Sequence, residues 1–92
     1  MASTSPGYGI TIRVEGSPDL QPVAQITSAL ASAGATITAL DVVESLLDRV
    51  VIDVTCDTVN ADHADEITDS LNKIEGLVVR KVSDRTFLLH LG

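Results

Sequence analysis

Every second residue from Tyr8 to Val14 is apolar, and the residues between them are polar or glycine. A period of two predicts a strand with one buried face. Residues 16–19 then interrupt the alternation with glycine, serine, proline and aspartate, which favour a turn. The sequence therefore predicts a first strand, a turn, and a helix that starts near Leu20.

The apolar spacing changes to that of a helix in two places. Both stretches repeat apolar or half-polar residues at i, i+3, i+7 and i+10, which places them on one helical face. Gly34 and Gly76 follow these stretches and are expected to end them, while Pro22 is compatible only with a first turn. The first set is Leu20, Val23, Thr27 and Leu30, and the second is Ala64, Ile67, Leu71 and Ile74.

Three further segments are rich in threonine, isoleucine and valine, as strands usually are. Residues 35–43 and 49–56 are expected to form a hairpin whose link lies near residues 44–48, and residues 77–82 form a last strand. Another apolar run, residues 86–91, follows a short polar break.

The element order is βαββαβ, which predicts an α+β fold of the ferredoxin-like kind. In this sandwich, two interleaved right-handed crossovers produce a four-stranded antiparallel sheet with both helices on one face. The run at residues 86–91 adds a C-terminal tail or an extra strand.

Charge and composition exclude several function classes. Six basic and thirteen acidic residues give a net charge of −7, which disfavours binding to nucleic acid or to an anionic membrane. Tyr8 and Phe87 are the only aromatic residues, so the aromatics on which an RNA-recognition module stacks bases are lacking. Cys56 has no cysteine to pair with, and no secretory signal precedes it, so a cytoplasmic location is expected.

Few residues suggest chemistry. His63 and Glu66 stand at i, i+3 and could share a divalent ion, but two ligands are too few, and a solvated acidic first turn is the favoured interpretation. His90 is interpreted as a packed or domain-contacting residue, and Cys56 as a small buried hydrophobe. No nucleophile with a neighbouring base, pair of carboxylates or glycine-rich phosphate loop is recognised, so we predict neither a catalytic nor a metal site.

The charges are unevenly distributed along the chain. Residues 57–75 are acidic, whereas Arg80, Lys81 and Arg85 make the last strand basic. Either this is ordinary solvated surface, or the basic edge meets an acidic neighbour in a second copy or in a following domain.

Six segments carry a resemblance to a known family: residues 26–30, 33–37, 41–44, 53–55, 63–64 and 82–92. Together they resemble an ACT domain, the small amino-acid-sensing regulatory module of metabolic enzymes. The last of them resembles the junction between an N-terminal ACT domain and the catalytic part of bacterial NAD-dependent malic enzymes.

Residues 1–7 are small and polar without periodicity, which indicates a disordered leader. The resemblance implies that an ACT domain (8–83) follows, with a junction (84–92) to a catalytic part that is absent. It implies that NAD(P), a divalent metal and malate oxidation belong to that absent part, so that this chain has no catalysis of its own. It further implies a homodimer or higher homo-oligomer, in contact with the catalytic domains, that holds an amino-acid effector between copies. The implied effector residues are Pro18, Asp19, Leu20 and Gln21 of the first loop, facing Thr36 and Ile37 of a partner's second strand.

The first loop departs from the family pattern, which commonly has Pro-Gly followed by an apolar residue. The glycine position is occupied by Gln21 or, in a shifted alignment, by Asp19. Asp19 would repel a carboxylate but would suit an ammonium group. Two functions therefore stay open, an effector-binding regulatory domain and a ligand-free dimerisation domain. A small acylphosphatase-like enzyme is disfavoured, because residues 16–21 contain neither the arginine nor the asparagine that it requires.

Overall fold

The computed structural model describes residues 8–84, and within them the elements follow the predicted order. The predictions for residues 1–7, for the run at 86–91 and for His90 lie outside the described residues. The strands are β1 (Tyr8–Gly16), β2 (Thr36–Ser45), β3 (Val50–Thr58) and β4 (Leu77–Asp84), and the helices are α1 (Pro22–Ser32) and α2 (Ala61–Asn72), with a short 3-10 turn η1 (Pro18–Leu20) before α1.

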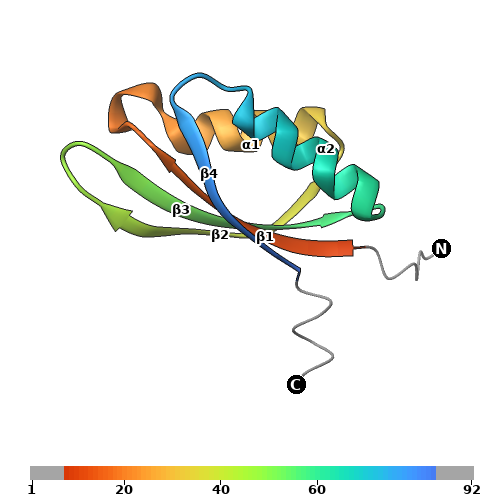
Figure 1. Ribbon diagram of the computed structural model, residues 1–92. Coiled ribbons are helices and arrows are strands. Elements are labelled where there is room, and N and C mark those ends of the chain that lie inside the picture. Colours follow the sequence, from red (N-terminus) through yellow and green to blue (C-terminus); the bar gives the residue numbers. More distant parts are fainter. Residues whose placement is uncertain (1–7, 85–92) are drawn as a thin grey trace.

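The four strands form one sheet in the order β2-β3-β1-β4, and every neighbouring pair is antiparallel. Both helices lie on the same side of this sheet (Figure 1). The predicted ferredoxin-like fold is therefore confirmed. It leaves one face of the sheet without a covering layer, and we call this surface the open face.

The core lies between the sheet and the helices and is almost entirely aliphatic. Alternate residues of the two central strands point into it, as the period of two predicted. Cys56 is one of them and is fully buried, and desolvation together with the charge of Asp57 raises the pKa of its thiol to about 11. The core residues are Ile10, Ile12 and Val14 from β1, Ile52, Val54 and Cys56 from β3, Ile26 and Leu30 from α1, Ala64, Ile67 and Leu71 from α2, and Leu77 from β4.

The helix ends follow the punctuation of the sequence. Pro22 is the first residue of α1, where its missing N–H removes no helical hydrogen bond. Gly34, with a φ angle of 81°, follows two residues after the end of α1, whereas Gly76, with a φ angle of 91°, lies in the turn between the end of α2 at Asn72 and β4. At the start of α2, Asn60 Oδ1 accepts a hydrogen bond of 2.9 Å from the backbone N–H of His63.

Several boundaries differ from those expected from the sequence: among them, β2 continues to Ser45, and α2 ends at Asn72, before Ile74 and Gly76. The chain at Leu20 forms a 3-10 turn, and the α-helix starts at Pro22. β3 continues to Thr58, whose hydroxyl donates a 2.6 Å hydrogen bond to the carbonyl of Tyr8 on the neighbouring strand. β4 continues to Asp84 because its pairing with β1 extends as far as Ile10.

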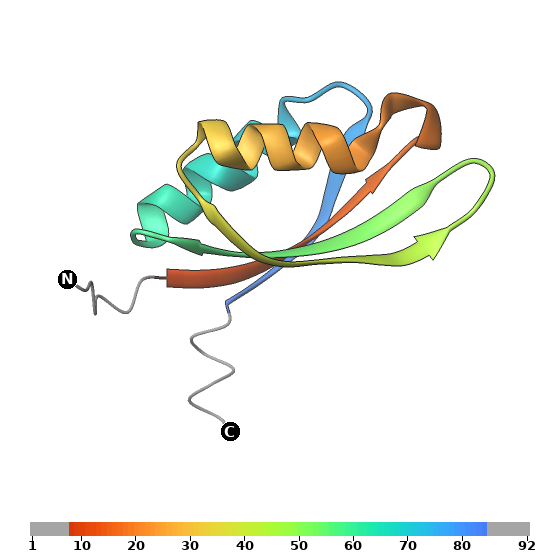
Figure 2. The same cartoon turned by 180° about the vertical axis from the view of Figure 1, so that it is seen from behind.

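The β2–β3 hairpin extends past the start of α1, so no helix covers its tip (Figure 2). Thr38 and Val43 are extra residues in β2, each forming a bulge opposite β3. Because the tip is uncovered, the large apolar side chains of Val42, Val43, Leu46 and Leu47 are exposed.

Candidate functional site

The first loop is the part of the predicted effector site that joins β1 to α1. Two backbone hydrogen bonds hold it, from Leu20 N–H to Ser17 O (3.1 Å) and from Gln21 N–H to Pro18 O (3.2 Å). Asp19 and Gln21 are exposed, and Pro18 is half-buried. Leu20 lies so closely over Gly76 that a side chain at this glycine would collide with Leu20 Cδ1. The loop is thus anchored by Leu20 and presents its polar side chains to solvent.

Gln21 has a backbone conformation that favours glycine. Its φ and ψ are 53° and 59°, in the left-handed region, and it is the only non-glycine residue with positive φ in the described part of the chain. Gln21 is also one of the two positions, the other being Asp19, at which the glycine of the resembled family aligns. The backbone at Gln21 thus follows a path suited to glycine, although the residue there is glutamine.

The start of α1 has no side-chain cap among the described residues. Pro22 has no N–H to donate. The first N–H of the helix that donates to a backbone carbonyl is that of Gln25, to the carbonyl of the N-cap residue Gln21. The amides of Val23 and Ala24 lie before it, where a helix leaves its N–H groups without an intrahelical partner. In contrast, α2 is capped by Asn60. Two backbone donors and the positive end of the helix dipole therefore face outward beside Gln21.

Thr36 and Ile37, the predicted second half of the site, are the first residues of β2. Thr36 pairs with Asp57 on the open face, whereas Ile37 pairs with Cys56 and packs against the core. The two side chains therefore point to opposite sides of the sheet, and only that of Thr36 is exposed.

One copy of the chain does not bring the two halves of the site together. The first loop follows Gly16, whereas Thr36 lies at the level of Gly9, because both Thr36 and Gly9 pair with Asp57. Seven residues of strand separate the two levels, about 23 Å at the usual rise. The predicted site is therefore complete only if a second copy supplies one half.

His63 links the two helices instead of serving a metal site. Its Nδ1 accepts a 2.9 Å hydrogen bond from Val59 N–H, and its Nε2 lies 2.7 Å from Ala33 O, just after α1. This pattern corresponds to a neutral imidazole with the proton on Nε2, because a carbonyl can only accept. Both ring nitrogens are occupied, so His63 cannot ligate a metal together with Glu66 in this arrangement. Sequence reasoning missed this role, since Ala33 and His63 lie 30 residues apart.

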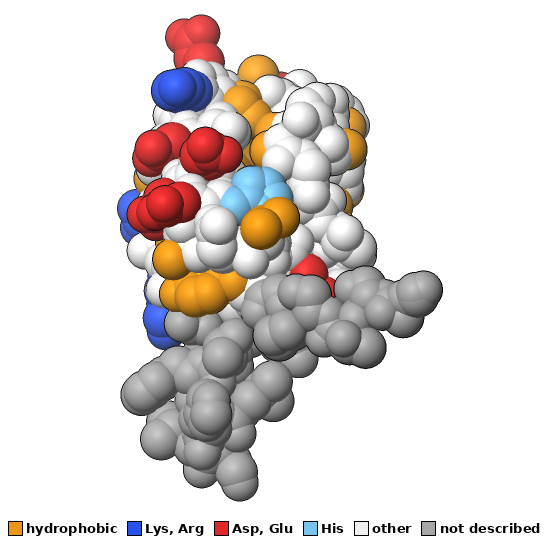
Figure 3. All heavy atoms as spheres, turned by 90° about the vertical axis from the view of Figure 1, so that its right-hand side faces the viewer, with side chains coloured by type: hydrophobic (Ala, Val, Ile, Leu, Met, Phe, Trp, Pro, Cys, Tyr) orange, Lys and Arg blue, Asp and Glu red, His pale blue; other side chains and the backbone are white. Residues whose placement is uncertain are grey.

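The remaining acidic residues of α2 point outward. Figure 3 shows acidic side chains gathered at the end of the domain where α2 begins. Asp62, Asp65, Glu66 and Asp69 are all exposed. No group of three histidine, cysteine, aspartate or glutamate side chains within residues 8–84 could hold a metal ion.

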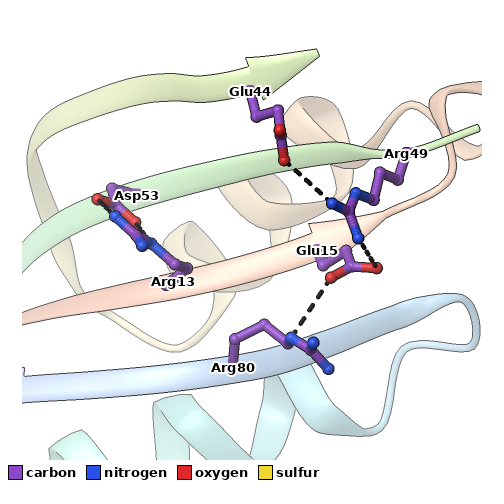
Figure 4. Close-up of polar contacts among 6 residues, drawn as sticks. All are labelled: Arg13, Glu15, Glu44, Arg49, Asp53 and Arg80. Atoms are coloured by element: carbon purple, nitrogen blue, oxygen red, sulfur yellow. Dashed lines mark hydrogen bonds and ion pairs between the residues drawn. The ribbon is translucent and has the colours of Figure 1, made fainter. Parts of the chain in front are cut away.

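The open face carries a network of ion pairs (Figure 4). Arg13 donates two hydrogen bonds to Asp53, from Nε to Oδ1 (2.8 Å) and from Nη2 to Oδ2 (2.9 Å). Glu15 lies between Arg80, at 3.3 Å, and Arg49, at 4.0 Å. The hydrogen bonds from Arg13 lower the pKa of Asp53 against the opposing effect of desolvation, and the positive charges of Arg13 and Lys81 lower it further.

The described surface has shallow hollows on two sides. On the open face, Thr11, Arg13, Asp53, Lys81 and Ser83 line a hollow of about 90 Å³. Between the helices, a groove of about 350 Å³ is lined by Ala24, Gln25, Ser28, Ala29 and Ile74. The described chain contains no helix of the length and apolarity needed to cross a membrane.

Comparison with known proteins supports the resemblance seen in the sequence. No protein-family profile matches the chain. The NAD-dependent malic enzyme of Geobacillus stearothermophilus is 37% identical to it over 83 residues, which is 90% of this chain but 17% of that enzyme. The chain thus spans about a sixth of the length of this relative.

Solved structures support the fold. The ACT domain of GTP pyrophosphokinase from Chlorobium tepidum aligns with a TM-score of 0.67 at 19% identity, covering 85% of this chain and 97% of that domain. A homoserine dehydrogenase from Thiobacillus denitrificans aligns with a TM-score of 0.65 at 16% identity, covering 87% of this chain and 17% of the enzyme. The chain therefore has the fold of an ACT domain, and it is similar in sequence to part of an NAD-dependent malic enzyme.

Proposed function

We propose that this chain is a non-catalytic regulatory and oligomerising domain of a malic-type enzyme, and that it binds a small amino acid between two copies. The observation that carries the proposal is the 37% identity to a malic enzyme over almost the whole of a chain with the ACT-type fold. NAD(P), a divalent metal and malate oxidation are assigned to other parts of such an enzyme, since this chain corresponds to 17% of the malic enzyme that it matches. We place it in the cytoplasm, where its buried thiol would remain reduced.

The first loop supports binding of an amino acid. The outward amides of Val23 and Ala24 suit an α-carboxylate, because a helix N-terminus favours negative charge. Asp19, exposed in the preceding turn, provides a negative charge for the ammonium group. The α-carboxylate and the ammonium group would then be bound by different parts of one loop, and Thr36 of the second copy would close the site.

The α1 side of the domain supports pairing of copies. α1 contains no charged residue from Pro22 to Ser32, and its exposed positions include Ala24, Ser28 and Ala31. Small uncharged side chains allow another helix to approach closely. β2 forms the adjacent edge of the sheet, so a contact on this side would also bring a second copy close to Thr36.

A ligand-free dimerisation domain is the second candidate. Gln21 favours it, since a side chain replaces hydrogen at the position where the family's glycine permits a ligand to approach the backbone. The two candidates share the dimer and differ only in whether an amino acid stabilises it.

Thermal unfolding against a panel of amino acids and malate distinguishes the two, because a ligand that binds only the native state raises the midpoint. Sedimentation of the same samples gives the mass. We expect one amino acid to raise the midpoint saturably, and Asp19→Asn and Thr36→Val each to reduce that shift. Asp69→Asn on the far surface is the matched control and should leave it unchanged. A dimer with no shift for any ligand supports the ligand-free candidate, and a monomer under all conditions contradicts both.

A further inference from the structure

The open face is ordered in rows that run across all four strands. Residues paired between antiparallel strands lie side by side on the same face, so the register defines which side chains form a row. One row is Asp41, Asp53, Arg13 and Lys81, from β2 to β4. Its charges are therefore negative, negative, positive and positive in the order of the strands.

The charges at the two ends of this row lack close partners within the described chain. Arg13 and Asp53, in the middle, bind each other through two hydrogen bonds. Asp41 and Lys81 form no ion pair within 4.0 Å among the described residues, although Lys81 acts on Asp53 from a longer distance. The β2 edge of the row thus carries an acid and the β4 edge carries a base, three strands apart.

Such a row is complementary to its own reverse. A two-fold axis parallel to the strands, placed midway between β3 and β1, lays β2 of one copy over β4 of the other. Asp41 then faces the second copy's lysine at position 81, and Asp53 faces its arginine at position 13. The strands of stacked sheets usually cross at about 30°. A two-fold axis that lies about 15° from the strands of each copy gives this crossing angle, because the axis doubles the angle between strands and axis.

The flanking rows tolerate the same arrangement. On one side lie Ala39, Thr55, Thr11 and Ser83, all small and uncharged, and the hydroxyls of Thr11 and Thr55 are 3.0 Å apart. On the other side lie Glu44, Val51, Glu15 and Val78, with Arg80 as the extra residue of the β4 bulge (Figure 4). Reversal of this second row lays Glu44 over the Val78–Arg80 end and Glu15 over Val51, so no two acids meet.

We propose that the open face is a contact surface for a second copy of this chain, stacked face to face about a two-fold axis nearly parallel to the strands. Asp41 of each copy pairs with Lys81 of the other, and the two Arg13–Asp53 pairs merge into one network. This contact is distinct from the α1 side invoked for the effector site, and the two can be tested separately. With both contacts present, the chain would form tetramers.

The contact is small, and its specificity rests on charge. Three rows across four strands cover roughly 300 Å² per copy, from a strand spacing of about 4.8 Å and a rise of about 3.4 Å. This area is below that of a standard stable interface, so we expect association at micromolar to millimolar concentrations of chain. Each copy has a net charge of −7, so two copies also repel each other at long range. Added salt would weaken both this repulsion and the ion pairs of the contact, so its net effect on association is ambiguous. Exchanging the charges of a single pair therefore tests the contact more directly than changing the salt concentration.

Sedimentation equilibrium of the 92-residue chain up to about 0.5 mM, with variants at the two edges, tests the proposal. Asp41→Lys and Lys81→Asp each place two like-charged pairs in the contact, so each should weaken one association step at least tenfold. The double variant Asp41→Lys with Lys81→Asp restores opposite charges and should recover the native constant to within about threefold. The control exchange Asp65→Lys with Lys73→Asp, on exposed positions of α2 and its C-terminal end, should have no effect.

Zero-length carbodiimide coupling of mixed ¹⁴N and ¹⁵N chains identifies the contact directly. Lys73 and Lys81 are the only lysines in the sequence, so few amide products are possible. Within one copy Asp41 and Lys81 are three strand spacings apart, about 14 Å, beyond the reach of their side chains. We expect a mixed-isotope product joining them, and none in Lys81→Arg. Four results would each overturn the proposal. In the coupling, Lys81 would join acids of α2 in another copy. In sedimentation, the single variants would associate like the native chain, the double variant would not recover association, or the native chain would show no association at about 0.5 mM.

Discussion

Replacement of His63 by alanine tests how the two helices are joined. The substitution removes the acceptor of Val59 N–H and the donor to Ala33 O, at 2.9 and 2.7 Å. Each hydrogen bond contributes about 0.5–1.5 kcal/mol, and a half-buried carbonyl left without a donor adds to the loss. We therefore expect His63→Ala to lower the free energy of unfolding by about 1–3 kcal/mol, with a fall in midpoint of roughly 4–8 °C per kcal/mol for a domain of this size.

Urea unfolding followed by circular dichroism measures this change, provided that the slope against urea is unaltered. Glu66→Ala is the matched control, because it removes the other member of the His63–Glu66 pair from an exposed position and should change stability by less than about 0.5 kcal/mol. A loss below that value for His63→Ala would refute the linking role. A rise in the native chain's midpoint on adding Zn²⁺, abolished by both variants, would instead support a metal site.

Three further substitutions test other parts of the structure. Hydrogen bonding from Arg13 lowers the pKa of Asp53, so the ionised carboxylate stabilises the fold above its unfolded pKa of about 3.9, and this stabilisation is lost as pH falls through the lower folded pKa. The difference in free energy of unfolding between the native chain and Asp53→Asn should therefore close below about pH 4, as acid titrations of unfolding would measure. The thiol of Cys56, with a pKa raised to about 11, should resist labelling by a disulfide reagent until the chain unfolds. The unfolded thiol ionises at lower pH than the buried one, so the free energy of unfolding of the native chain, relative to Cys56→Ala, should fall by on the order of 2 kcal/mol as pH rises from about 9 to about 11. Urea melts at both pH values measure this change. Gln21→Gly should leave stability unchanged or raise it by up to about 1 kcal/mol, because it relieves left-handed backbone strain, whereas Gln21→Val should lose more than about 1 kcal/mol; equal effects would contradict the φ angle of Gln21.

Local patterns in the sequence predicted most of the fold. The alternation of residues 8–14 identified the buried face of β1, and Gly34 marked the end of α1 because a positive φ angle suits glycine. Gly76 also has a positive φ angle, but α2 ends four residues before it, at Asn72. The 3-10 turn before α1 was missed because Leu20 fits the helical spacing equally well. Its side chain instead lies over Gly76, a tertiary contact that periodicity does not reveal.

The arrangement of charges on the open face could not be predicted in the same way. The alternation of residues 8–14 placed Thr11 and Arg13 on the face opposite the buried one, but which side chains of the other strands lie beside them depends on the register. The bulges at Thr38, Val43 and Arg80 shift that register within two of the three strand pairs. Likewise, the sequence suggested both halves of the effector site, but only the pairing of Thr36 with Asp57 shows that they lie at opposite ends of one copy.

An amide NMR titration of the ¹⁵N-labelled chain with amino acids tests the proposed regulatory role most directly. The first loop and the start of β2 are about 23 Å apart in one copy, so a small ligand can contact both only across two copies. We predict that one amino acid shifts the amides of residues 19–24 and 36–37 together, with a common saturation curve, in a sample whose mass is that of an oligomer. An oligomer in which no amino acid produces saturable shifts, or in which the shifts are confined to one of the two segments, would contradict this role.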